Sequence, residues 1–121
     1  MINYQDLIVW QKSMDLAEEV YKLIKFLPKD EMYVISSQLK RASISIPSNI
    51  AEGNSRNTTK EYIQFLYIAR GSKAEIETQL LLCDKLHLLQ KNQVVPVLDL
   101  CSEIGKMLNS LIVKLESKIN P

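Results

Sequence analysis

Apolar residues recur along this chain every three or four positions, the spacing that places them on one face of an α-helix. Only 3 glycines and 4 prolines interrupt the pattern. It predicts helices from about Gln5 to Phe26, Asp30 to Gly53, Thr58 to about Leu86, and from about Val95 onward. Because short loops join helices of similar length, we expect an all-α fold, an antiparallel up-and-down four-helix bundle forming one domain over residues 1–121.

Three of the predicted helices carry one apolar stripe each, which we expect to face the core. The stripes are Leu7, Trp10, Met14, Ala17, Tyr21 and Ile24 in the first helix, Met32, Ile35, Leu39, Ala42, Ile46 and Ile50 in the second, and Leu98, Cys101, Ile104, Leu108, Leu111 and Leu115 in the fourth. These stripes are typical of helices that bury one side.

The third predicted helix is different, because it is apolar or aromatic around nearly its full circumference near its start. The residues concerned are Tyr62, Ile63, Phe65, Leu66, Tyr67 and Ile68. One bundle core does not bury so much apolar surface, so the sequence favours a homo-oligomer. The alternative is a monomer whose core is widened by large side chains.

A proline lies inside the second predicted helix, in the stretch from Ser43 to Gly53. Pro47 has no N–H, so the carbonyl of Ser43 loses its helical partner, at a cost of about 3 kcal/mol. We expect the helix to kink or restart there, and Gly53 to end it. The face opposite the core carries Ser37, Arg41, Ser45, Ser48 and Glu52. This face is either solvated or meets another subunit or a ligand.

Small residues in Ala69-Arg70-Gly71-Ser72 interrupt the third predicted helix near its middle. A glycine there costs about 1 kcal/mol relative to alanine. We therefore expect a neighbouring helix to approach closely at Gly71. A phosphate cradle is disfavoured, because a lone glycine within a helix is not a glycine-rich loop at a helix N-terminus.

Charge is distributed unevenly along the chain, although the net charge is only +1. Six of the 15 basic residues but only two of the 14 acidic ones lie from Ser36 to Lys73, so this segment carries +4 and the remainder −3. Cations that neutralise phosphates release counterions and give sequence-independent binding. The candidate nucleic-acid contacts are Lys40, Arg41, Arg56, Lys60 and Arg70. The alternative is ordinary ion pairing among Arg70, Lys73 and Glu77.

Catalysis has little support in the sequence, and we expect no enzyme, catalytic residue, cofactor or metal site. His87 is the only histidine, and near a helix end it suits the helix dipole. Neighbouring carboxylates such as Glu18 and Glu19 do not face one another on a helix. The cysteines, Cys83 and Cys101, lie far apart and are typical of buried thiols in a reducing compartment.

The sequence also predicts a cytoplasmic protein without a membrane partner. Its first residues lack the basic and apolar regions of a signal peptide. No apolar run approaches the ~20 residues that a membrane-spanning helix needs.

Four blocks of the chain, taken in order, resemble a known family. They are Asp6–Lys12, Gln38–Ala42, Ser45–Gly53, and Ala69–Ser72 followed by Glu75 and Glu77. The resemblance is to the four-helix bundle proteins encoded by bacterial 23S rRNA intervening sequences, which are similar to the accessory proteins of diversity-generating retroelements. It implies a subunit of a homopentameric barrel with a positively charged surface that binds nucleic acid. In the retroelement relatives, that surface also engages the reverse transcriptase.

The resemblance also implies roles for individual residues. Lys40 and Arg41 match the family's basic pair, Arg56 follows its glycine-terminated motif, and Arg70 precedes its Gly-Ser step. The matching motif residues, which we interpret as structural, are Pro47, Asn49, Glu52, Gly53, Gly71 and Ser72. The modest net charge favours the intervening-sequence branch.

Two functions remain open from the sequence. One is an oligomeric module that binds structured RNA or other nucleic acid. The other is a protein-interaction scaffold or accessory subunit that recruits an unknown protein partner without touching nucleic acid.

Overall fold

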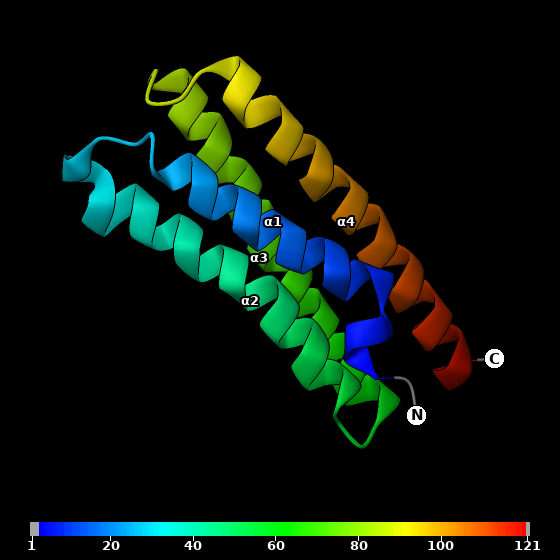
Figure 1. Cartoon of the computed structure of the whole chain (residues 1–121). Coiled ribbons are helices and arrows are strands. Elements are labelled where there is room, and N and C mark those ends of the chain that lie inside the picture. The colour runs from blue at the N-terminus through cyan, green and yellow to red at the C-terminus, as the bar shows by residue number, and fades with distance from the viewer. Residues whose placement is uncertain (1–2, 121) are drawn as a thin grey trace.

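The computed structural model describes residues 3–120, which form four long helices and no strand (Figure 1). The long helices are α1 (Ile8–Ile24), α2 (Ser37–Asn54), α3 (Thr59–Lys85) and α4 (Lys91–Ile119). Three short helical segments accompany them: 3₁₀ turns at Tyr4–Asp6 and Lys29–Glu31, and a π-helical stretch at Met32–Ser36. The α1–α2 and α3–α4 connections lie at one end, and the α2–α3 connection lies at the other. The predicted all-α fold with four helices is therefore confirmed.

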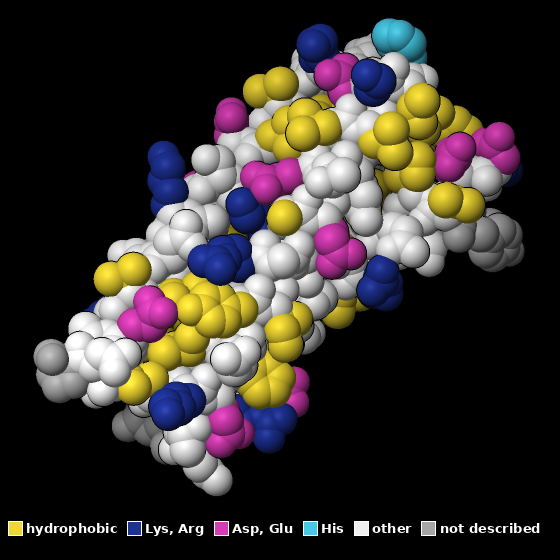
Figure 2. Space-filling model, turned by 180° about the vertical axis from the view of Figure 1, so that it is seen from behind, with side chains coloured by type: hydrophobic (Ala, Val, Ile, Leu, Met, Phe, Trp, Pro, Cys, Tyr) yellow, Lys and Arg dark blue, Asp and Glu magenta, His cyan; other side chains and the backbone are white. Residues whose placement is uncertain are grey.

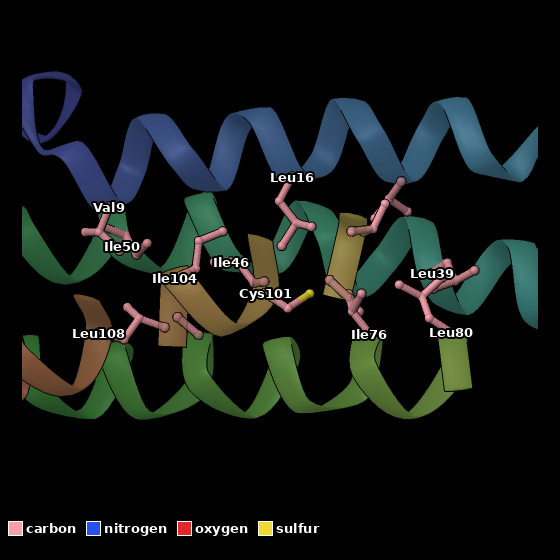
Figure 3. Close-up of a cluster of buried hydrophobic side chains, with 14 of the residues drawn as sticks. Val9, Leu16, Leu39, Ile46, Ile50, Ile76, Leu80, Cys101, Ile104 and Leu108 are labelled. Atoms are coloured by element: carbon pink, nitrogen blue, oxygen red, sulfur yellow. The ribbon is translucent and has the colours of Figure 1, made fainter. Parts of the chain in front are cut away.

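The core lies between the four helices, and most of the predicted stripes of α2 and α4 are buried in it (Figure 3). The buried residues include Leu39, Ile46 and Ile50 of α2, Ile76 and Leu80 of α3, and Cys101, Ile104 and Leu108 of α4. Burial of each large aliphatic side chain contributes about 1.5–3 kcal/mol. Leu98 and Leu111 are only partly buried, and the side chain of Met32 lies outside the described residues.

The predicted core stripe of α1 is only partly right: Leu7, Trp10 and Ile24 are half-buried against the core, but the stripe is not the buried face of the helix. The residues that α1 buries are Val9, Ser13, Leu16, Val20 and Leu23. A serine therefore occupies the centre of the buried face, where its hydroxyl donates a 2.6 Å hydrogen bond to the carbonyl of Val9. That bond satisfies the buried hydroxyl. The predicted stripe instead forms a flank of α1, where Met14 is 46% exposed and Tyr21 is 39% exposed.

Pro47 is buried within α2, which continues through it without restarting. Side-chain hydrogen bonds form next to the proline, at Ser45. The Asn49 Nδ2 donates to the carbonyl of Ser45 at 2.7 Å and to its hydroxyl at 2.9 Å. The same Ser45 hydroxyl accepts a 2.8 Å hydrogen bond from Ser72 of α3. Ser45 therefore joins α2 to α3 beside the proline, which the sequence did not indicate.

The sequence predicted that Gly53 ends α2, and this prediction is wrong. Gly53 lies within the last turn of the helix and has a negative φ. A β-carbon at Gly53 would lie 2.8 Å from the Phe65 Cβ and 3.2 Å from the carbonyl oxygen of Tyr62. No real β-carbon tolerates such contacts without movement of its neighbours. Glycine is thus required because α3 passes so close to the end of α2.

Gly71 shows the opposite situation, and the predicted close approach at this residue is wrong within the subunit. It is exposed, and a β-carbon there would meet nothing within 4 Å. The small residues of this segment that are buried are instead Ala69, in the core, and Ser72, which hydrogen-bonds Ser45 of α2.

The ends of α3 and α4 follow from local hydrogen bonds. Thr58, where the third helix was predicted to begin, is the N-cap of α3, since its hydroxyl accepts a 3.1 Å hydrogen bond from the Glu61 N–H. The fourth helix begins at Lys91, four residues before the predicted Val95. Gln90 and Gln93 form a capping box there, although glutamine is not a preferred N-cap residue.

His87 adopts the left-handed conformation just after α3, with φ 59. Its N–H donates to the carbonyl of Asp84 at 3.1 Å, and the N–H of Leu88 donates to the carbonyl of Cys83 at 2.9 Å. These two bonds form a Schellman motif. Histidine therefore occupies a position where glycine is the usual residue.

Candidate nucleic-acid interface

The five predicted cations do not form one patch. Lys40 and Arg41 lie in the first half of α2, whereas Arg56 lies in the α2–α3 connection and Lys60 at the start of α3. The rise of 1.5 Å per residue places Arg56 about 24 Å farther along the bundle than Lys40. Arg70 lies in the middle of α3, on the side that faces α4.

Lys40 and Arg41 point to different sides of α2. The Lys40 Nζ lies 5.6 Å from the centroid of the Tyr21 ring of α1. The Arg41 guanidinium instead hydrogen-bonds Gln38 and lies 3.9 Å from a carboxylate oxygen of Glu75 on α3. Consecutive helical residues diverge by about 100° because a turn contains about 3.6 residues, so these neighbours form no single basic surface.

Arg56 and Lys60 form the second group. Arg56 makes a 3.1 Å ion pair with Glu52, and its guanidinium lies 4.8 Å from the centroid of the Phe65 ring. Lys60 is exposed in the first turn of α3 and makes no ion pair with another described residue. The motif residue Glu52 therefore serves to position Arg56.

Arg70 belongs to a mixed cluster between α3 and α4. It hydrogen-bonds the Asn109 side chain at 3.1 Å and lies 4.9 Å from the centroid of the Tyr67 ring. The Tyr67 hydroxyl donates a 3.1 Å hydrogen bond to Glu116, and this bond raises the pKa of the tyrosine. An open hollow of about 390 Å³ lies beside these residues. Because it contains one guanidinium and one carboxylate, it has no excess of positive charge.

The alternative of ordinary ion pairing is confirmed for Lys73 but not for Arg70. The Lys73 Nζ lies 3.0 Å from a Glu77 carboxylate oxygen, with the side chains 17% and 29% exposed. Arg70 reaches Asn109 instead. Figure 2 shows that basic, acidic and apolar side chains are interspersed on the visible face.

A basic cluster that the sequence analysis missed lies at the α1–α2 connection. Its centre is a hollow of about 210 Å³ lined by Ile24, Lys25, Leu27, Pro28, Lys29, Ser36 and Lys40. No carboxylate is among these lining residues. The counting of charge along the chain hid Lys25 and Lys29, because they lie in the part whose total is negative. The sequence did contain a signal for this cluster, because Lys25 and Lys29 are only four residues apart and Pro28, which follows the first helix, lies between them.

The described residues offer few groups for other chemistry. Residues 3–120 contain no group of three or more His, Cys, Asp or Glu side chains that could hold a metal ion. Both cysteines are buried, and burial raises the pKa of the Cys101 thiol to about 12. Within the same residues, none of the helices combines the length and the hydrophobicity that a membrane span requires.

The four-helix arrangement defines a small all-α bundle protein. The chain belongs to the 23S rRNA-intervening sequence protein family, whose model matches residues 5–110. It is also similar to the crystal structure of a protein of unknown function from the S23 ribosomal protein family of Bacteroides thetaiotaomicron VPI-5482. The two share 30% sequence identity and a TM-score of 0.81, over 87% of this chain and 98% of that one. No curated protein matches the chain. The family resemblance read from the sequence is thereby confirmed.

Proposed function

We propose that this protein is a non-enzymatic, cytoplasmic homo-oligomer, a pentamer, of antiparallel up-and-down four-helix subunits. The assembly binds structured RNA or other nucleic acid through exposed cations. The proposal has two parts, self-association and nucleic-acid binding, and each rests on its own observation.

Self-association is supported by the outward face of α3. A stripe there includes Ile68, Gly71, Ala74, Thr78 and Leu82, all of them exposed, and one charged residue, Glu75, lies one turn after Gly71 on the same face. Gly71 at its centre has open space above it, and its φ is not positive. A mid-helix glycine costs about 1 kcal/mol relative to alanine. The subunit itself gives no reason for that cost, whereas a helix of a second copy packed on this stripe does.

A second apolar surface lies on a different side, in a groove between α1 and α2 of about 370 Å³. Its lining includes Trp10, Met14, Ile44 and Pro47. In Figure 1, α1 and α2 lie in front of α3. Two unlike apolar surfaces on one subunit favour a head-to-tail contact over a two-fold one. A repeated head-to-tail contact closes into a ring when its rotation allows.

Nucleic-acid binding is supported by the exposure of Arg41, Arg56, Lys60 and Arg70. One subunit displays them in separate small groups. An oligomer would repeat each group around its axis, and simultaneous contacts would raise the avidity without any new contact type.

The test is binding of a labelled RNA hairpin by the purified chain over a range of salt concentrations. We expect affinity to fall steeply with salt and to be lost in Arg41→Ala/Arg56→Ala. The control Lys106→Ala/Lys118→Ala removes the same charge from α4 and should bind nearly as well as wild type. Absence of binding at low salt, or equal effects of the two double variants, would contradict this part of the proposal.

A protein-interaction scaffold is the second candidate, and the ion pairs favour it. Glu75 and Glu52 partly neutralise Arg41 and Arg56, which reduces their availability to phosphates. A co-purifying protein partner, together with no shift of any RNA or DNA, would select this candidate.

A further inference from the structure

We propose that the hollow at the α1–α2 connection is a phosphate-binding site formed by Lys25, Lys29, Lys40 and Ser36. We call it the lysine hollow. It deepens the nucleic-acid binding proposed above by placing a phosphate anchor away from most of the cations identified from the sequence. The assignment of the bound phosphate to RNA rests on that proposed function, whereas phosphate binding itself does not.

The charge of the lysine hollow carries the argument. Three lysines line one hollow of about 210 Å³, and none of the lining residues is acidic. Within residues 3–120, no ion pair joins Lys25, Lys29 or Lys40 to a carboxylate. By contrast, Arg41, Arg56 and Lys73 each have a carboxylate within 4 Å. The lysine hollow thus brings together three lysines that make no ion pair with a described carboxylate, although Asp30 and Glu31 follow Lys29 in the same 3₁₀ turn.

Its other walls suit an anion held by lysines. Ile24, Leu27 and Pro28 contribute apolar surface, which weakens solvent screening and strengthens the attraction between ammonium and phosphate. Ser36 is buried and lines the same hollow, so it forms part of the inner wall. A serine hydroxyl adds a neutral donor to the three ammonium groups.

The fold assembles this site from the α1–α2 connection and the start of α2. Lys25 and Lys29 follow the end of α1, and Lys40 comes from the second turn of α2. The Lys40 Nζ is already placed near the Tyr21 ring, 5.6 Å from its centroid. Because an ammonium group held over an aromatic ring is already partly ordered, its side chain loses less conformational entropy when it binds an anion.

The size of the hollow limits its ligand. At about 210 Å³ it is smaller than the range of about 300–1,000 Å³ typical of pockets for whole small molecules. We therefore assign it to a phosphate group that is part of something larger, an RNA backbone phosphate. Free phosphate or a nucleotide phosphate shares the chemistry, and the experiment separates these sources.

The first arm titrates the ¹⁵N-labelled full chain with inorganic phosphate against chloride at constant ionic strength. We expect amide shifts at Lys25, Lys29, Ser36 and Lys40 that vanish in Lys25→Ala/Lys29→Ala/Lys40→Ala. A matched control, Lys85→Ala/Lys106→Ala/Lys118→Ala, removes three exposed lysines elsewhere and should keep the shifts.

The second arm measures binding of a labelled RNA hairpin to the same proteins. We expect the hollow triple variant to bind about tenfold more weakly than the control, with a salt slope shallower by about one phosphate contact. The variant Lys25→Arg/Lys29→Arg/Lys40→Arg keeps the charge and should retain most of the affinity. It also guards against misreading a folding defect as a loss of binding.

The outcomes are distinct. Phosphate shifts without any RNA binding would support the lysine hollow as a site for free or nucleotide phosphate and contradict the proposed RNA function. RNA binding that responds equally to the hollow and control variants, without phosphate shifts at the hollow, would overturn the site and leave the RNA function standing. Phosphate shifts spread equally over the control lysines would also overturn it.

Discussion

Two glycines on facing helices, Gly53 and Gly71, mark two very different regions of this small bundle. At Gly53, α2 and α3 come so close that a β-carbon would lie 2.8 Å from the Phe65 Cβ. At Gly71, the outward face of α3 is open, and a β-carbon would meet nothing within 4 Å. The first glycine is explained by the packing of its own subunit. Nothing within the subunit explains the second, which is why we connect it with the proposed self-association.

Gly53→Ala should have the largest effect of the changes that sharpen this comparison. The added methyl forces Phe65 and the Tyr62 carbonyl to move, and overpacking of this kind costs about 1–3 kcal/mol. Urea denaturation monitored by circular dichroism measures the loss. Unchanged stability would mean that the α2–α3 contact is looser than the structure indicates.

Ser45→Ala should have the next largest effect, because it removes the hydroxyl that accepts from both Asn49 and Ser72. Leaving a buried donor unsatisfied costs about 1–3 kcal/mol, and the partly exposed site places our expectation at the lower end. Ser72→Ala removes only one bond and should cost less. If the two substitutions cost the same in urea denaturation, Ser45 does not join the two helices as described.

Gly71→Ala should move two measurements in opposite directions. The free energy of unfolding of the isolated subunit should rise by about 1 kcal/mol, because alanine has a higher helix propensity than glycine and the subunit leaves room for the methyl group. The oligomer should dissociate at higher protein concentration than wild type, because the close contact is lost. Sedimentation at several concentrations, together with urea denaturation of the dilute protein, separates the two effects. A gain in stability with no change in self-association would contradict the proposed α3 contact.

His87→Gly should have the smallest effect, and it stabilises the protein. His87 holds φ 59 at the position after α3 where glycine is normally found. Relief of the left-handed strain should outweigh the greater freedom of glycine in the unfolded chain, for a net gain of about 0.5–1 kcal/mol. The midpoint of thermal unfolding checks this. A lower midpoint would show that the histidine side chain makes a contribution larger than the backbone strain.

The sequence predicted the fold well where helix and core depended on periodicity alone. The stripes of α2 and α4 were found because their buried positions are almost entirely apolar. The stripe of α1 was misplaced because Ser13 is buried and satisfied by the Val9 carbonyl, while exposed Met14 and Tyr21 looked like core residues. Both the local bond and the exposure depend on the folded neighbours.

The candidate site was less predictable, because it depends on which helix faces meet. Lys40 and Arg41 are adjacent in the chain but point toward α1 and α3 respectively. Lys25 and Lys29 gain Lys40 as a neighbour only when α2 folds back beside the end of α1. Similarly, Gly53 read locally is a helix-ending residue, and its real role comes from α3 passing beside it.

Light scattering on the purified wild-type chain and on Gly71→Glu tests the central claim most directly. A glutamate at Gly71 enters open space in the subunit, so the fold should persist, but it places a second carboxylate on the exposed stripe of α3, one turn before Glu75. We predict an oligomeric mass for wild type and the 13.9 kDa mass of one chain for the variant. A wild-type protein that is monomeric at micromolar concentration, or a variant that keeps the wild-type mass, would contradict the account.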